Sequence, residues 1–225
     1  MDLENKIVLA HKGFASSKSK DTYKENSIGA CKESSDTDYI SIIELDVRKS
    51  KDNILYCYHG TLLQYCTTLK LSKNLAAIQN QYAVSTLSDI LEIISSNKIL
   101  LLDIKDTSIT KEDIAKVFKD KTFKEVILGN KSVRYLNRFT DMPDSFVKIL
   151  NGNLFSNFYN LDELKKKGFK YFAPIFSFQL TTGAFSKVEK SVLMFRISGV
   201  GFITKKSYWR KINKYNITHV SSDFI

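Results

Sequence analysis

The sequence is poor in the residues that break or cross-link a chain. Of its 225 residues, only 2 are proline, 9 are glycine and 3 are cysteine. These counts exclude a collagen-like or proline-rich chain, and three cysteines without a C-x-x-C pair exclude a disulfide framework. Cys57 and Cys66 lie close enough in sequence to close a short loop. We nevertheless expect Cys31, Cys57 and Cys66 to be free thiols in a reducing compartment.

Long apolar runs are also absent. No stretch approaches the roughly 18 apolar residues that a membrane span needs, so we expect no transmembrane segment. The opening MDLENKIVLAHKG is acidic before it becomes apolar, which is unlike a secretory signal. We therefore expect the mature chain to begin at Met1 and to be cytoplasmic.

Arginine is scarce in a basic chain. The net charge is +10, yet only 5 of the 34 basic residues are arginine. Nucleic-acid readers rely on arginine forks, and the lysines here are not gathered into one block, so we expect no nucleic-acid partner. A positive field of this size could instead attract small anionic substrates such as phosphodiesters.

Short β-rich runs alternate with amphipathic segments along the chain. The predicted strands are 6–11, 39–47, 98–105, 124–128, 146–150, 169–173, 200–204 and 217–221. The predicted helices are 27–34, 87–94, 114–118, 132–139, 161–167, 183–195 and 208–215. Eight strands alternating with helices predict an α/β fold, either a (β/α)₈ TIM barrel or an open doubly wound sheet. Without a linker or an internal repeat, we expect residues 1–225 to form a single domain.

Two features depart from this regularity. Residues 48–84 are long for one connection, and 54–58 (ILYCY) within them is strand-like. The chain ends at Ile225, directly after the eighth predicted strand, which leaves no room for a full closing helix. A second copy of the chain could cover the face left open, so self-association is one expectation to test.

The strand IIELDV at 42–47 carries two carboxylates. Residues two apart share a face of a strand, so Glu44 and Asp46 point one way and the apolar Ile43, Leu45 and Val47 point the other. Buried carboxylates need a cation or hydrogen bonds, and a pair suits Mg²⁺ or Ca²⁺. The alternative is a pair of surface charges on an edge strand.

A second strand repeats the pattern, and two histidines follow strands. In KILLLDIK at 98–105, Asp103 and Lys105 share a face, either as a simple ion pair or as a third metal ligand beside a phosphate-binding cation. His11 and His59 each end a predicted strand close to a glycine, where barrel enzymes place active residues. Such a pair could act on a phosphorus atom as nucleophile or base and as general acid. His219, inside the last strand, is more typical of a structural histidine.

Together these motifs resemble the glycerophosphodiester phosphodiesterase family. His11-Lys12-Gly13, Glu25-Asn26-Ser27, Glu44-Leu45-Asp46-Val47, His59 and Asp103-Ile104-Lys105 occur in the order of the family's H-R-G, P-E-N-T, E-L-D-V, H-D and I-E-I-K. The resemblance is strong over 7–59, fair over 98–105 and weak from 106 to 216.

The resemblance implies a TIM barrel with its site at the carboxyl ends of the strands. It makes Glu44, Asp46 and Asp103 the ligands of a divalent cation, Mg²⁺ or Ca²⁺. It makes His11 and His59 the acid–base or nucleophilic pair, while Lys12 and Lys105 would hold the phosphoryl oxygens. The implied reaction splits a small glycerophosphodiester into sn-glycerol 3-phosphate and an alcohol.

Several positions depart from the family pattern. Lys12 replaces the usual Arg, Lys24 a Pro, Gly60 an Asp and Asp103 a Glu. His59-Gly60 and Asp103-Ile104-Lys105 also resemble the H-G and D-L-K of the related sphingomyelinase D branch, whose enzymes resemble phospholipase D and can close a cyclic phosphate. Two alternatives therefore remain beside hydrolysis of a water-soluble diester. One is cleavage of a lysolipid headgroup, and the other is an inactive barrel that binds phosphorylated ligands.

Overall fold

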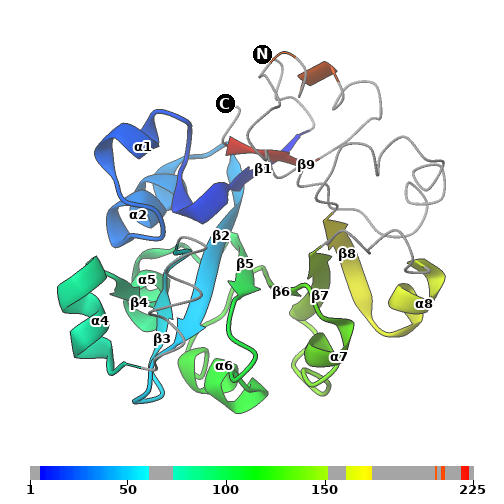
Figure 1. Cartoon of the computed structure of the whole chain (residues 1–225). Helices are drawn as coiled ribbons and strands as arrows, with labels where there is room; N and C mark the ends of the chain where they lie inside the picture. The colour runs from blue at the N-terminus through cyan, green and yellow to red at the C-terminus, as the bar shows by residue number, and fades with distance from the viewer. Residues whose placement is uncertain are drawn as a thin grey trace.

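The computed structural model describes residues 6–60, 73–151, 161–173, 206, 209–210 and 219–222. Parallel strands form its centre, and helices lie outside them (Figure 1). The parallel strands are β1 (Ile7–Ala10), β2 (Ile40–Lys49), β5 (Ile99–Ile104), β6 (Glu125–Asn130), β7 (Phe146–Asn151), β8 (Phe169–Ala173) and β9 (His219–Ser221). Each corresponds to a predicted strand, and the remaining prediction, 200–204, lies outside the described residues.

The order of these strands identifies the fold. Pairing runs β9-β1-β2-β5-β6-β7-β8, and every one of these pairs is parallel. A doubly wound sheet reverses its strand order at a switch point, whereas here the order follows the chain from β1 to β8 and the last strand, β9, pairs with the first. The fold is therefore the predicted TIM barrel. The predicted strand at 200–204 falls between β8 and β9 in sequence, where the described sheet is not closed.

The two faces of the strands pack against different partners. Ile43, Leu45 and Val47 of β2 belong to the large core between the sheet and the helices. Ile42 packs instead with Leu9, Leu101, Ile127 and Ile149 in a smaller cluster inside the barrel. The alternation read from the sequence is confirmed, and it leaves the even-numbered side chains of β2 facing the interior.

The helices agree with the prediction in most places. The helical elements are η1 (His11–Gly13), α1 (Ser19–Thr22), α2 (Ile28–Asp36), α4 (Leu75–Tyr82), α5 (Leu87–Ile93), α6 (Lys111–Val117), α7 (Val133–Leu136) and α8 (Leu161–Lys166). Predicted helices account for α2, α5, α6, α7 and α8. α6 begins at a capping box in which Thr110 and Asp113 each bond the other's backbone N–H. The predictions at 183–195 and 208–215 lie outside the described residues, apart from 209–210.

The long connection after β2 holds a strand that the sequence predicted and a helix that it did not. β3 (Leu55–Cys57) pairs antiparallel with β2, and β4 (Ser85–Thr86) pairs antiparallel with β3. The unpredicted α4 buries Leu75 and Ile78 beside Tyr56. These apolar residues recur at helical spacing, but the polar residues around them hide the pattern.

Among the described helices, none combines the length and the hydropathy needed to cross a bilayer. Cys31 and Cys57 are buried free thiols, as expected. Burial raises the pKa of the Cys31 thiol to about 12, with a smaller contribution from Glu44, so this thiol is un-ionised near neutral pH. Cys66 and the end of the chain lie outside the described residues, so the missing closing helix stays a prediction.

Candidate active site

Two neighbouring parallel strands carry the acidic residues of the site. β2 supplies Glu44 and Asp46, whose side chains are 0% and 1% exposed. β5 pairs with β2 in a register that sets Asp46 opposite Asp103. Because strands in register present the same face at the same height, the three carboxylates meet toward the carboxyl ends of both strands.

The three carboxylates form a group that could hold a metal ion. One oxygen from each of Glu44, Asp46 and Asp103 lies within 4.8 Å of the others. All three donors are carboxylate oxygens, which hard divalent cations prefer, and two of the side chains are fully buried. Buried negative charges need compensation, so the donor set fits a divalent cation.

Lys105 compensates part of this charge. Its Nζ lies 2.8 Å from Asp46 Oδ1 and also contacts Asp103 Oδ2. Burial opposes the ammonium, but Asp103, Asp46 and Glu44 outweigh it and raise the pKa of Lys105 well above its usual range. Burial likewise opposes the Asp46 carboxylate, yet Lys105, His59 and Asn26 hold the pKa of Asp46 well below its usual range. Both groups are therefore charged near neutral pH.

Two asparagines hold the aspartates in place. The Asn26 side chain donates to Asp46 Oδ2 at 2.9 Å and accepts from the Asp46 N–H at 2.9 Å. Asn151, at the end of β7, donates to Asp103 Oδ1 at 2.8 Å. Asn26 is 1% exposed and adopts φ 57°, a left-handed conformation that asparagine tolerates. Each aspartate thus has one oxygen held by an amide and the other by Lys105.

The turn after β1 brings His11 and Lys12 to Glu44. The Lys12 N–H donates to Glu44 Oε2 at 2.7 Å, and His11 Nε2 lies 4.0 Å from the same oxygen. Lys12 has φ 55°, so a left-handed residue aims this N–H at the carboxylate. The His11 N–H donates to Ser222 Oγ at 3.1 Å, which ties the turn to the chain just after β9.

The Lys12 ammonium forms an ion pair with Glu25, which is not one of the three carboxylates. Its Nζ bonds Glu25 Oε2 at 2.7 Å, so Glu25 occupies it in this structure. The Asn26 N–H donates to the Lys12 carbonyl at 2.8 Å, which fixes the two turns against each other. Lys12 therefore reaches the site through its backbone, and its side chain lies at the site's edge.

His59 follows β3 and lies within electrostatic reach of Asp46. Its pKa lies below the ordinary 6.5, chiefly because burial disfavours the charged ring. Asp46 opposes this shift, while Lys12 and Lys105 add to it, so all three lie within electrostatic reach of His59. The imidazole is neutral near neutral pH and can accept a proton.

The structure brings together all the site residues that the sequence singled out. His11, Lys12, Glu44, Asp46, His59, Asp103 and Lys105 lie around one group of carboxylates. Sequence reasoning gave no role to Asn26, Asn151, Glu25 or Ser222. Asn26 and Glu25 were visible as part of the ENS motif, and Asn151 directly follows the strand predicted at 146–150, which is the usual signal for a barrel site.

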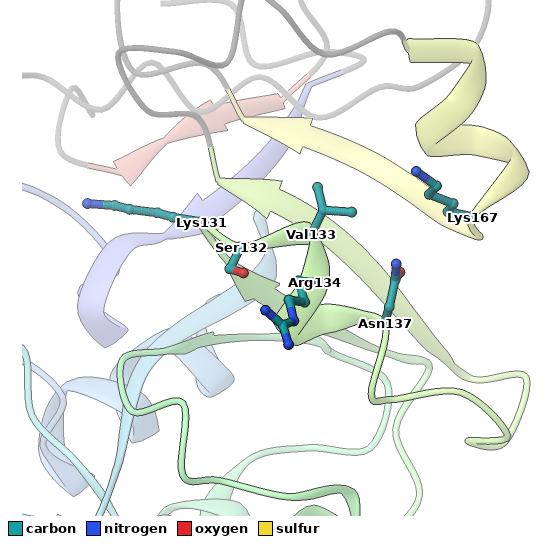
Figure 2. A pocket seen from close by; sticks show the side chains of 6 residues that line it. All are labelled: Lys131, Ser132, Val133, Arg134, Asn137 and Lys167. Carbon is teal, nitrogen blue, oxygen red and sulfur yellow. The ribbon is translucent and has the colours of Figure 1, made fainter.

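A separate basic groove lies on the outside of the barrel. It has a volume of about 570 Å³ and is lined by Lys131, Ser132, Val133, Arg134, Asn137 and Lys167 (Figure 2). The three cationic side chains are exposed. The groove shares no lining residue with the carboxylate group, so it is not part of the candidate active site.

Solved structures resemble the fold along almost the whole chain. A glycerophosphodiester phosphodiesterase from Thermotoga maritima has a TM-score of 0.73 at 17% identity, covering 97% of this chain and 95% of its own. An Oleispira antarctica phosphodiesterase, solved in complex with the product sn-glycerol-3-phosphate, has a TM-score of 0.68 at 15% identity, covering 96% and 92%. A glycerophosphodiester phosphodiesterase from Parabacteroides distasonis has a TM-score of 0.68 at 15% identity, covering 97% and 93%.

No curated protein sequence matches this chain significantly. A family model does match it. The model of the glycerophosphoryl diester phosphodiesterase family matches residues 11–153, a range that contains every site residue named from the sequence. The chain therefore belongs to the glycerophosphoryl diester phosphodiesterase family and is a phosphodiesterase.

Proposed function

We propose that the protein hydrolyses glycerophosphodiesters to sn-glycerol 3-phosphate and an alcohol with the help of a divalent cation. One observation carries this proposal. Three carboxylate oxygens lie within 4.8 Å of one another at the carboxyl ends of barrel strands, His11 lies 4.0 Å from Glu44, and His59 lies within electrostatic reach of Asp46. Barrel enzymes hold their chemistry at this end, and membership of the family supplies the phosphodiester class.

Glu44, Asp46 and Asp103 would hold the cation, which we propose to be Mg²⁺ or Ca²⁺. When bound, such an ion polarises phosphoryl oxygens and offsets their negative charge. We assign the phosphoryl oxygens to Lys105, which already lies among the carboxylates, and to Lys12 at the edge. A lysine is a point charge without the planar fork of arginine, so Lys12 contributes charge and not bidentate geometry.

The two histidines would move the protons. Burial keeps the pKa of His59 low, so we assign His59 as the base that removes a proton from the attacking water or hydroxyl. The oxygen so activated forms a bond to phosphorus, and the bond from phosphorus to the alcohol oxygen breaks. His11, whose Nε2 lies 4.0 Å from Glu44 Oε2, would then protonate the leaving alcohol.

The solved neighbours support the product and the extent of the domain. The Oleispira antarctica enzyme binds sn-glycerol-3-phosphate, the product that we propose here. The structures from Thermotoga maritima and Parabacteroides distasonis each cover 97% of this chain. This coverage supports the proposal that residues 1–225 form one catalytic domain.

A second candidate is the cleavage of a lysolipid headgroup with formation of a cyclic phosphate. The observation in its favour is Gly60, which follows His59 where the family usually has Asp. Gly60 has φ 75°, a conformation that favours glycine, so this turn is built for the His-Gly sequence. Asp103, which stands where the family usually has the longer Glu, also favours this second candidate.

Phosphorus NMR of reaction mixtures tests these candidates. The purified protein is incubated with Mg²⁺ or Ca²⁺ and with glycerophosphocholine, glycerophosphoethanolamine, glycerophosphoglycerol or lysophosphatidylcholine. We expect a monoester signal from at least one glycerophosphodiester, which also names the alcohol. A cyclic phosphate from the lysolipid would favour the second candidate. If none of the four substrates gives a new phosphorus signal, both candidates are contradicted for these substrates. That result would favour an inactive barrel that binds phosphorylated ligands.

A further inference from the structure

We propose that Arg48 is a positioning residue that fixes the backbone of His59 relative to the carboxylates. The inference rests on the proposed role of His59, and nothing in that role assigns a task to Arg48. Arg48 acts through the main chain that carries the histidine.

Arg48 is a buried cation next to the site. Its side chain is only 2% exposed and is among the largest fully buried side chains of the described residues. It lies on β2 two residues beyond Asp46, so both side chains leave the same face of the strand. Burying a guanidinium is costly unless its donors are satisfied, so a residue kept in this place needs specific partners.

Those partners lie at the end of the strand that carries His59. Arg48 Nε donates to the Tyr58 carbonyl at 2.9 Å, and Arg48 Nη2 donates to the His59 carbonyl at 2.9 Å. The Tyr58 N–H meanwhile donates to the Asp46 carbonyl at 2.9 Å. Two consecutive carbonyls are therefore held by one planar fork, and the adjoining N–H is held by the strand that bears the metal ligands.

The remaining side of the guanidinium faces Asp106. Arg48 Nη1 lies 3.4 Å from Asp106 Oδ1, while Asp106 Oδ2 accepts from the Lys49 N–H at 2.9 Å. Asp106 directly follows Lys105, whose ammonium lies among the carboxylates. One buried group thus connects the ends of three strands: β2 with Asp46, β3 with His59, and β5 with Asp103 and Lys105.

This connection matters because His59 stands at the end of its strand. Gly60, the next residue, takes φ 75°, so the ladder of β3 does not continue through it. The hydrogen bonds from Arg48 to the Tyr58 and His59 carbonyls therefore fix the backbone position from which the His59 imidazole extends. A base displaced by about 1 Å can cost roughly a hundredfold in rate. Loss of the Arg48 hydrogen bonds to the Tyr58 and His59 carbonyls should therefore lower kcat more than it weakens substrate binding.

The direct test is Arg48→Lys, which keeps the positive charge but cannot donate to both carbonyls as a fork. We expect kcat to fall at least about tenfold, with KM and the affinity for Ca²⁺ changed less than about twofold. Partial recovery of the kcat of Arg48→Ala by added guanidinium would support the same role. A folded Arg48→Lys variant with wild-type kcat would overturn the proposal.

Arg138→Ala is the matched control. The Arg138 guanidinium also donates to a loop carbonyl, that of Thr107, but contacts no residue of the site. Its loss should leave kcat unchanged. If Arg48→Lys fails to fold, Asp106→Asn replaces it, because that change weakens the contact between residue 106 and Arg48 without altering the guanidinium. Unchanged kcat in folded Asp106→Asn would then overturn the proposal, and a loss of kcat would support it.

A second readout does not depend on the substrate. The chain has only 3 histidines, so the imidazole signals of His11, His59 and His219 can be followed separately by NMR. In Arg48→Lys we expect the His59 signal to move and the His219 signal to stay. If wild-type protein turned over none of the substrates, the proposed function would fail, while this readout would still decide the role of Arg48. An unmoved His59 signal would contradict it.

Discussion

The Lys105 ammonium lies 2.8 Å from Asp46 Oδ1 and also contacts Asp103. A cation of the protein itself therefore sits between two of the three carboxylates that we assign to the metal. Two cations that share the same carboxylates compete for them. Lys105 consequently has two effects. It stabilises the negative carboxylates when no metal is bound, and it lowers their affinity for a metal ion.

Replacing Lys105 by Met should strengthen metal binding. We expect Lys105→Met to bind Ca²⁺ about tenfold or more tightly in a calorimetric titration, because the competing charge is gone. Turnover should nevertheless fall, since a phosphoryl contact is lost. Lys121→Met, which breaks an ion pair with Glu92 away from the site, should change neither. Weaker Ca²⁺ binding by Lys105→Met would contradict this account of the carboxylates.

The low pKa of His59 predicts the acid limb of the pH profile. Burial disfavours the imidazolium, so the neutral base persists below pH 6.5, and activity should fall only when the pH drops through the lowered pKa. We expect the acid limb of kcat/KM, where activity falls as the pH drops, to lie below pH 6.5. His59→Ala should abolish turnover with a nearly unchanged thermal melt. An acid limb with its midpoint above pH 6.5 in the wild type would argue against His59 as the base.

Asn26 should be needed for both stability and metal binding. Asn26→Gly removes the two buried hydrogen bonds to Asp46 while keeping the left-handed φ, and should cost about 1–3 kcal/mol in urea unfolding. Ca²⁺ affinity should fall as well, since Asp46 loses its orientation. Asn53→Gly is the control, because Asn53 is also left-handed, at φ 61°, but exposed. Equal effects of the two changes would refute the role of Asn26.

His219 should make the folded protein sensitive to mild acid. Burial lowers its pKa to about 4, although Glu125 opposes the shift. The unfolded chain takes up a proton at His219 near pH 6.5, whereas the folded chain does so only near pH 4. Protonation therefore favours the unfolded chain between these values, and the free energy of unfolding falls as the pH drops from 6.5 to about 4. The loss is at most about 3 kcal/mol. His219→Gln should flatten the stability profile between these values, and an unchanged slope would contradict the assignment.

The fold and the carboxylates could be predicted because they follow from strand periodicity. Alternation in β2 separated Glu44 and Asp46 from Ile43, Leu45 and Val47, and the structure confirms that separation. The same alternation in β5 placed Asp103, and the register of the two strands brought it opposite Asp46. The two-residue alternation of a strand is visible in the local sequence, so it can be recognised without any knowledge of the loops.

The contacts made by loops could not be read in this way. Asn26 reaches Asp46 because both it and Lys12 adopt left-handed conformations in neighbouring turns, and no periodicity encodes that. Alternation put Arg48 on the same face as Asp46, but its carbonyl partners come from a hairpin whose register is set by tertiary pairing. The ion pair between the Lys12 ammonium and Glu25 is a loop contact of the same kind, and the role of Lys12 at the phosphoryl group stays a prediction.

The central claim is that Glu44, Asp46 and Asp103 hold the divalent cation on which phosphodiester hydrolysis depends. The most direct measurement is glycerol 3-phosphate release, followed by phosphorus NMR, for wild type and Glu44→Gln with chelator and over increasing Mg²⁺ or Ca²⁺. We predict no release by wild type in chelator, recovery with the metal, and a much higher metal requirement for Glu44→Gln. Undiminished release under strong chelation, or the same metal requirement in both proteins, would contradict the claim.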